Sequence, residues 1–180
     1  MSNYRRPQIP GATIFFTVAL ASRGTDTLTR EIETLRQAIR QTRAERPFHI
    51  NAWVVLPDHM HCVWTLPQGD ADFATRMAAI KARFSMTLRR SGFTPTLPSF
   101  NPYGAKAGRD RTPTTKRVGV NPDLQKNEAS IWQKRYWEHH IRNDVDLRNH
   151  IHHCWLNPVK HGLADHPKDW PYSSYHHDNP

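Results

Sequence analysis

The prediction of the fold starts from residues 48–66, FHINAWVVLPDHMHCVWTL. It contains two runs rich in β-branched and aromatic residues, at 48–56 and 59–66, and such runs are typical of β-strands. Pro57 and Asp58 stand between the runs, and both residue types favour tight turns. The stretch therefore predicts a β-hairpin.

The second strand of this hairpin carries two histidines with one residue between them. Side chains two apart on a strand point to the same face, so His59, His61 and Val63 share one face. Two neighbouring imidazoles can chelate a single cation. They can equally pack or form hydrogen bonds without a metal, so this pair alone leaves both interpretations open.

The hairpin lies between two predicted helices. A strand at 12–20 comes first, and a helix over about 26–46 follows it, because apolar residues recur there at helical spacing until Pro47. After the hairpin, Asp70 or Asp72 caps a second helix. Its apolar face is formed by residues at helical spacing: Phe73, Met77, Ile80, Phe84 and Leu88.

The C-terminal third supplies a last strand and a last helix. The aromatic run 131–141 predicts the strand, and Asn143 or Asp144 caps a helix over about 145–156 that Pro158 ends. The predicted order is βαββαβ followed by a helix. This order is typical of an α+β, ferredoxin-like fold, an antiparallel sheet with helices on one face, here with an added C-terminal helix.

Positive charge is concentrated in the middle of the chain. The formal net charge is +9 over 180 residues, and residues 76–117 hold ten Lys and Arg against Asp110 as the one acid. Helical periodicity stops at the end of the second helix, so we expect a single domain over 1–180 with a basic, flexible insert at about 91–129. A basic block is typical of a polyanion binder such as a nucleic-acid-binding protein, although a solvated basic loop has the same composition.

Composition excludes several classes of protein. No run approaches the roughly 18 apolar residues of a membrane span, and prolines interrupt the N-terminus where a signal peptide would be apolar. Two cysteines, Cys62 and Cys154, are too few for a disulfide framework or a four-thiolate zinc site. We therefore expect a cytoplasmic protein without a membrane partner.

The last predicted helix carries a further candidate metal ligand. His153 and Asn157 are four residues apart and share a face of that helix. The amide oxygen of Asn157 is a hard ligand of the kind that Mg²⁺ prefers. Its position before Pro158 also suits a helix C-cap, and the sequence leaves the two roles open.

Three segments, in this order, resemble one family. They are NYRRPQIPGATIFFTV (3–18), VVLPDHMHCVWTLP (54–67) and the end of the chain (136–176), with YWEHHIRNDVDLRNHI, NPVKHGL and DWPYSSYH. On these segments the chain resembles the REP-associated tyrosine transposases, relatives of the single-strand tyrosine transposases in the HUH endonuclease superfamily. The resemblance covers nearly the whole chain outside the insert.

The resemblance implies a function and a site. Members have a ferredoxin-like fold, bind single-stranded DNA that contains REP-type hairpins, cleave it beside the hairpin and can rejoin the ends. A tyrosine attacks phosphorus to give a 5′-phosphotyrosine and a free 3′-hydroxyl, assisted by Mg²⁺ or Mn²⁺. The family's metal ligands correspond here to His59, His61 and Asn157. The resemblance also implies a monomer.

The sequence departs from the family at the nucleophile. The family places its tyrosine four residues before the asparagine of NPVKHGL, and here that residue is His153. Three interpretations stay open. The chain binds DNA and metal without covalent cleavage; or the nucleophile has moved to Tyr136, Tyr172, Tyr175 or His153 itself; or His153 joins the two strand histidines as a metal ligand and favours hydrolysis by water.

Residues for DNA contact follow from charge and from the resemblance. Arg5 and Arg6 belong to the N-terminal motif, which resembles part of the family's surface for bases near the hairpin. Phosphate contacts are expected from the second helix, through Lys81, Arg83, Arg89 and Arg90. Four tryptophans can stack unpaired bases or pack in the core: Trp64, Trp132, Trp137 and Trp155.

Overall fold

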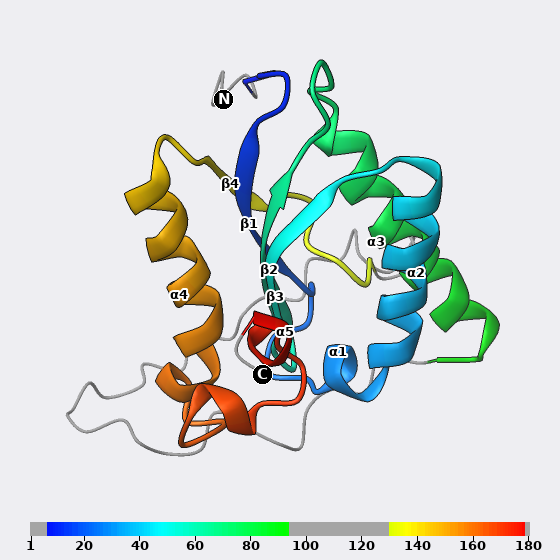
Figure 1. Ribbon diagram of the computed structural model, residues 1–180. Helices are drawn as coiled ribbons and strands as arrows, with labels where there is room; N and C mark the ends of the chain where they lie inside the picture. The colour runs from blue at the N-terminus through cyan, green and yellow to red at the C-terminus, as the bar shows by residue number, and fades with distance from the viewer. Residues whose placement is uncertain (1–6, 94–129, 179–180) are drawn as a thin grey trace, which may run out of the picture.

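The computed structural model describes residues 7–93 and 130–178. Its sheet consists of β1 (Thr13–Ala19), β2 (His49–Val55), β3 (His59–Thr65) and β4 (Trp137–His140). The helices are α1 (Thr27–Arg30), α2 (Ile32–Glu45), α3 (Phe73–Arg90) and α4 (Asp144–Lys160), followed by the short η2 (Pro167–Asp169) and α5 (Tyr175–Asp178). Helices α2 and α3 lie side by side on one face of the sheet, and α4 covers the other face (Figure 1).

The strand order is β2-β3-β1-β4, and every neighbouring pair is antiparallel. β1 therefore lies in the middle of the sheet, between β3 and β4, although it comes first in the sequence. This is the predicted βαββαβ arrangement, with α4 as the added C-terminal helix. The prediction of an α+β, ferredoxin-like fold is confirmed.

The pleat of the sheet divides the core into two layers. Phe16 and Trp64 point toward α2 and α3, where the larger apolar cluster forms. Phe15 and Val63, at alternate positions of β1 and β3, pack under α4 together with Cys154. Complete burial of a large apolar side chain contributes about 1.5–3 kcal/mol. Both layers therefore hold the sheet, and the α4 layer also carries the predicted site histidines.

Helix α4 runs past its predicted end. Asn143 caps its start by accepting a hydrogen bond from the N–H of Asp146 at 2.9 Å. Pro158 lies inside the last turn, where it removes one N–H donor without ending the helix, and the helix ends before Gly162, whose φ is +67°. The C-cap role considered for Asn157 is therefore excluded, because this residue lies within the helix.

The first predicted helix is divided into two. The helix expected over 26–46 breaks at Glu31, whose φ of −101° and ψ of 31° are not helical. The N–H of Leu28 in α1 donates to the carbonyl oxygen of Pro57 at 2.9 Å. This hydrogen bond ties α1 to the β2–β3 turn. The apolar periodicity of residues 26–46 cannot predict it.

The last strand is shorter than predicted. The aromatic pattern predicts one strand over 131–141, but only the second half of this run joins the sheet as β4. Trp132 is buried against Phe84 of α3, and its indole N–H donates to the carbonyl oxygen of Lys81 at 3.2 Å. It pairs with Leu20 only through an isolated bridge, so packing on α3 overrides its strand preference.

Two predictions fall outside the described residues. The insert at 91–129 is described only for its first three residues, and Arg5 and Arg6 precede the described part of the chain. Within 7–93 and 130–178, no helix combines the length and the hydrophobicity that a bilayer crossing requires.

Candidate metal centre

Histidines from β3 and α4 meet on the face of the sheet that α4 covers. His59 and His61 point to this face, as the alternation predicts, and both are buried. Their ring centres are 5.1 Å apart. The ring of His153 lies 4.9 Å from that of His61, and the ring of His161, just after α4, lies 5.4 Å from that of His59. Four imidazoles thus converge where α4 crosses β3.

A buried carboxylate orients His59. The Nδ1 atom of His59 lies 2.7 Å from Oδ1 of Asp58. The other oxygen of Asp58 accepts hydrogen bonds from the backbone N–H of Gly24 at 2.7 Å and from Nε of Arg23 at 3.0 Å. A carboxylate at Nδ1 favours the proton on that nitrogen, and this is the tautomer in which an imidazole binds a cation through Nε2.

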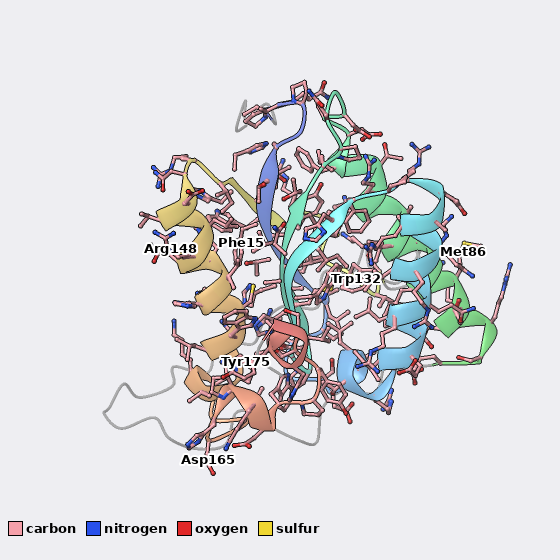
Figure 2. All side chains as sticks on the ribbon, in the orientation of Figure 1. Phe15, Met86, Trp132, Arg148, Asp165 and Tyr175 are labelled. Atoms are coloured by element: carbon pink, nitrogen blue, oxygen red, sulfur yellow. The ribbon has the colours of Figure 1, made fainter. Side chains whose placement is uncertain are left out.

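His61 has a hydroxyl in the corresponding place. Its Nδ1 lies 2.9 Å from Oγ1 of Thr17, and its ring stacks on Phe15 at 5.6 Å. Figure 2 shows Phe15 between the sheet and α4. Burial, reinforced by the neighbouring His59, lowers the pKa of His61 to about 2. The imidazole is therefore neutral at physiological pH, the form that binds metals.

Asn157 contributes an amide oxygen to the same cluster, and this oxygen has no hydrogen-bond partner among the described residues. Its side chain is 3% exposed, and Nδ2 donates to Nε2 of His153 at 3.1 Å. Its Oδ1 is buried and accepts no hydrogen bond from the described residues. A buried polar atom left unpaired costs about 1–3 kcal/mol. A cation beside His59 and His61 would use this oxygen, so the donor set fits a divalent metal.

His153 is the part of the site that faces solvent. The residue is exposed, and its ring packs edge-on against Phe15 at 5.5 Å. Partial burial and the charge of Lys160 lower the pKa of His153. A neutral imidazole therefore stands where the family resemblance places the nucleophile.

The described tyrosines pack elsewhere. Tyr136 packs against Phe16 at 5.9 Å and belongs to the core layer under α2 and α3, which is the opposite face of the sheet. Tyr172 lies beside Trp170, and Tyr175 packs edge-on against Trp155. The structure therefore does not bring these three side chains to the histidine cluster, and His153 is the residue it places there.

A second polar cluster ties β4 to α4. The carboxylate of Asp146 lies 2.9 Å from Nε2 of His139 and 3.2 Å from Nδ1 of His150. It also accepts hydrogen bonds from the backbone N–H and from Nε of Arg142. These bonds, that from His139 above all, hold the pKa of Asp146 well below its usual range. The three ligand atoms lie within 4.8 Å of one another, as a metal site requires, yet the bonds already satisfy the carboxylate.

The basic residues predicted on the second helix lie far from the histidines in the fold. Lys81, Arg83, Arg89 and Arg90 are on α3, which lies across the sheet from α4 (Figure 1). Lys81 donates to the carbonyl oxygen of Gln133 at 2.8 Å, and Arg83 forms an ion pair with Glu45 of α2. Their binding to DNA stays a prediction.

The tryptophans divide between core and surface. Trp64 and Trp132 are buried and pack in the core, so they are not available for stacking on bases. Trp137 is 56% exposed at the start of β4, where its ring stacks on His139 at 5.9 Å. Of Trp64, Trp132 and Trp137, only Trp137 is exposed, and its ring packs against Phe15 on the face of the sheet that carries the histidines.

Several residues that shape the centre are not evident from the sequence pattern. The sequence pattern assigns Asp58 to a turn, although its position directly before His59 could have indicated a contact with that histidine. Thr17 reaches His61 only because β1 pairs with β3, and the register Thr17↔His61 cannot be derived from either segment alone. His161 lies within the NPVKHGL motif, four residues after Asn157, a spacing that favours a shared helix face.

Comparison with known proteins identifies the family. No family model matches the chain. A REP-associated tyrosine transposase of Escherichia coli (strain K12) is 42% identical over 178 residues, covering 99% of this chain and 85% of that protein. A relative from Haemophilus influenzae is 39% identical, covering 99% of this chain and 88% of the relative.

A solved structure agrees with the sequence relatives. The structure of a REP-associated tyrosine transposase bound to a REP hairpin superposes with a TM-score of 0.74 at 41% identity, and it covers 99% of this chain and 85% of that one. The fold agrees with this kinship. The chain belongs to the REP-associated tyrosine transposase family.

Proposed function

We propose that this protein binds single-stranded DNA carrying a REP-type hairpin and holds a divalent cation, Mg²⁺ or Mn²⁺, with His59, His61 and Asn157. The observation that carries the metal part is the buried, unpaired Oδ1 of Asn157 beside two histidines whose Nδ1 atoms are already engaged. The DNA part is supported by kinship to a transposase whose structure contains a REP hairpin.

The residues around the cation would position one phosphate of the strand. A bound divalent cation supplies charge neutralisation and Lewis acidity to a non-bridging phosphate oxygen. Asp58 fixes the ring of His59, and Thr17 fixes that of His61. His153 is the exposed member of the cluster, so we propose that the strand approaches the cation past this residue.

We propose further that the protein does not form a phosphotyrosyl intermediate. Covalent cleavage in the family requires a tyrosine at the position of His153, and the described tyrosines lie elsewhere. The protein is then a hairpin-binding member that retains the metal centre. Arg5, Arg6 and the basic residues of α3 are proposed to contact the DNA.

A second candidate is favoured by one observation, the 4.9 Å separation between the rings of His153 and His61. At this separation the imidazole of His153 can replace the missing nucleophile or join the cation as a third histidine. Strand cleavage, through a phosphohistidine or by water, would then survive. Imidazole ligands favour Mn²⁺ and later transition metals over Mg²⁺.

Two further properties belong to this proposal. The cysteines Cys62 and Cys154 are both free and buried, which suits the reducing cytoplasm. We also propose that the protein acts as a monomer, as the resemblance implies.

The proposal is tested with a labelled REP-type hairpin and a scrambled strand of equal length, both measured by fluorescence anisotropy. The hairpin should bind at least about tenfold more tightly than the scrambled strand, as expected of a specific complex. Calorimetry with Mn²⁺ should show binding that Asn157→Ala weakens and His152→Ala, an exposed histidine on the same helix, does not. Equal affinity for the two strands would contradict the DNA part, and equal Mn²⁺ affinity in the two variants would contradict the metal part.

A further inference from the structure

A groove lies at the edge of the sheet, away from the histidines. Its volume is about 460 Å³, within the roughly 300–1,000 Å³ of small-molecule pockets. It is bounded by α2, by the edge strand β2 and by the segment Tyr172–Ser174 before α5. Because α2 covers the face opposite α4, this groove and the metal centre lie on different sides of the sheet (Figure 1).

Three arginines form one rim of the groove. Arg36, Arg40 and Arg43 lie four and three residues apart, so they share one face of α2. All three are exposed. Arg36 forms an ion pair with Glu33 at 2.6 Å, and Nε of Arg43 donates to a carbonyl oxygen. Arg40 forms neither a hydrogen bond nor an ion pair with any described residue, so its guanidinium is available to a ligand.

The floor of the groove is apolar and aromatic. Leu35 and Trp53 are buried beneath it, and the half-buried side chains of Ile39 and Tyr172 line the space above them. An apolar floor beside a cationic rim is the combination that single-stranded nucleic acid requires, because bases stack on flat apolar side chains while phosphates pair with guanidinium groups.

The opposite wall of the groove is held by hydrogen bonds within the protein. The N–H of Val55 donates to the carbonyl oxygen of Tyr172 at 2.9 Å, and the N–H of Ser174 donates to that of Trp53 at 2.8 Å. The hydroxyl of Ser174 accepts a hydrogen bond from the N–H of Trp53 at 3.0 Å. The C-terminal segment is therefore fixed to β2 as an added edge, and hydroxyl groups of Ser173 and Ser174 line the groove.

We infer that this groove binds a single-stranded stretch of DNA next to the hairpin. Phosphates lie along Arg36, Arg40 and Arg43, and a base enters the space lined by Ile39 and Tyr172. The inference rests on the proposed function in its choice of DNA as the polyanion. It goes further in placing a second DNA-binding surface on the opposite face of the sheet, so that the strand passes around the edge formed by β2.

The experiment compares three fluorescein-labelled probes by anisotropy: the hairpin alone, the hairpin with a single-stranded dT extension of about eight nucleotides, and the dT segment alone. For the unaltered protein the extension should raise affinity about tenfold. Arg40→Ala should remove most of this gain and leave the affinity for the bare hairpin unchanged. Its matched control is Arg148→Ala, an exposed arginine on α4 (Figure 2), which should keep the gain.

Salt dependence provides a second readout. Each arginine–phosphate pair that a substitution removes should lower the slope of log affinity against log salt by about 0.7 for a single strand. If the extension adds no affinity, or if Arg40→Ala and Arg148→Ala reduce the gain equally, the inference is overturned while hairpin binding stands. If the bare hairpin does not bind but the dT segment binds in an Arg40-dependent way, the groove is supported and the proposed hairpin function fails. If no probe binds, both fail.

Discussion

Replacing Asp58 by asparagine changes one oxygen into an NH₂ group at the most enclosed point of the site. The carboxylate faces three donors: Nδ1 of His59, the N–H of Gly24 and Nε of Arg23, at 2.7, 2.7 and 3.0 Å. An amide can accept hydrogen bonds only on its oxygen. In Asp58→Asn the new NH₂ group therefore faces a hydrogen-bond donor of the protein on one side.

The cost follows from these hydrogen bonds. A buried donor left without an acceptor costs about 1–3 kcal/mol. Loss of the ion pair with Arg23, whose side chain is 50% exposed, adds at most about 1 kcal/mol. The expected loss of stability is therefore roughly 1–4 kcal/mol. Each kcal/mol lowers the Tm of a domain of this size by about 2–4 °C.

The same substitution should weaken the metal centre. Because Asp58 orients the ring of His59, its loss should reduce Mn²⁺ affinity by about 10–100-fold. Thermal unfolding and calorimetric titration measure the two effects separately. Asp165→Asn, the same chemical change at an exposed position (Figure 2), is the control and should alter neither. If Asp58→Asn behaves like this control in both assays, the argument that Asp58 holds His59 for a cation is wrong.

Three further predictions test the surrounding structure. Asp146→Asn should lower Tm at pH 7. Because folding lowers the pKa of Asp146, its stabilisation is full above the ordinary carboxyl pKa of about 3.9 and fades as pH falls below it, so the difference in Tm between the variant and the unaltered protein should shrink steadily as pH is lowered from about 4 toward about 2. Arg76→Met should destabilise by about 3–5 kcal/mol in urea titrations, because Arg76 is 3% exposed and bonds Asp70 and three backbone carbonyls; a loss below about 1 kcal/mol would show that these bonds add little. Trp137→Ala should weaken hairpin binding by about 1–3 kcal/mol with little change in Tm, whereas Trp137→Phe should retain most of the affinity; unchanged binding of the alanine variant would remove Trp137 from the DNA surface.

The sequence predicts the centre of this fold well because its signals there are local. Alternation along β3 alone places His59 and His61 on one face, and the structure agrees. Element boundaries are predicted less accurately where a distant residue intervenes. Leu28 is held by the β2–β3 turn, and Trp132 is held by α3, and neither partner is close in sequence.

The site shows the same division. The spacing of His153 and Asn157 predicts their shared face, and the structure adds a hydrogen bond of 3.1 Å between them. Spacing does not predict that the amide oxygen of Asn157 is left without a partner, because that depends on how α4 lies on the sheet. The proximity of Thr17 to His61 likewise depends on strand register.

The most direct test of the account concerns position 153. End-labelled single-stranded hairpin DNA is incubated with Mn²⁺ and either the unaltered protein or His153→Tyr, and the products are separated on denaturing gels. The double variant His153→Tyr, Asn157→Ala is the control for metal dependence. The account predicts that only His153→Tyr cuts the strand and forms a covalent adduct, and that the control does neither. Cleavage by the unaltered protein would contradict it, and the residue carrying any adduct would identify the nucleophile in use.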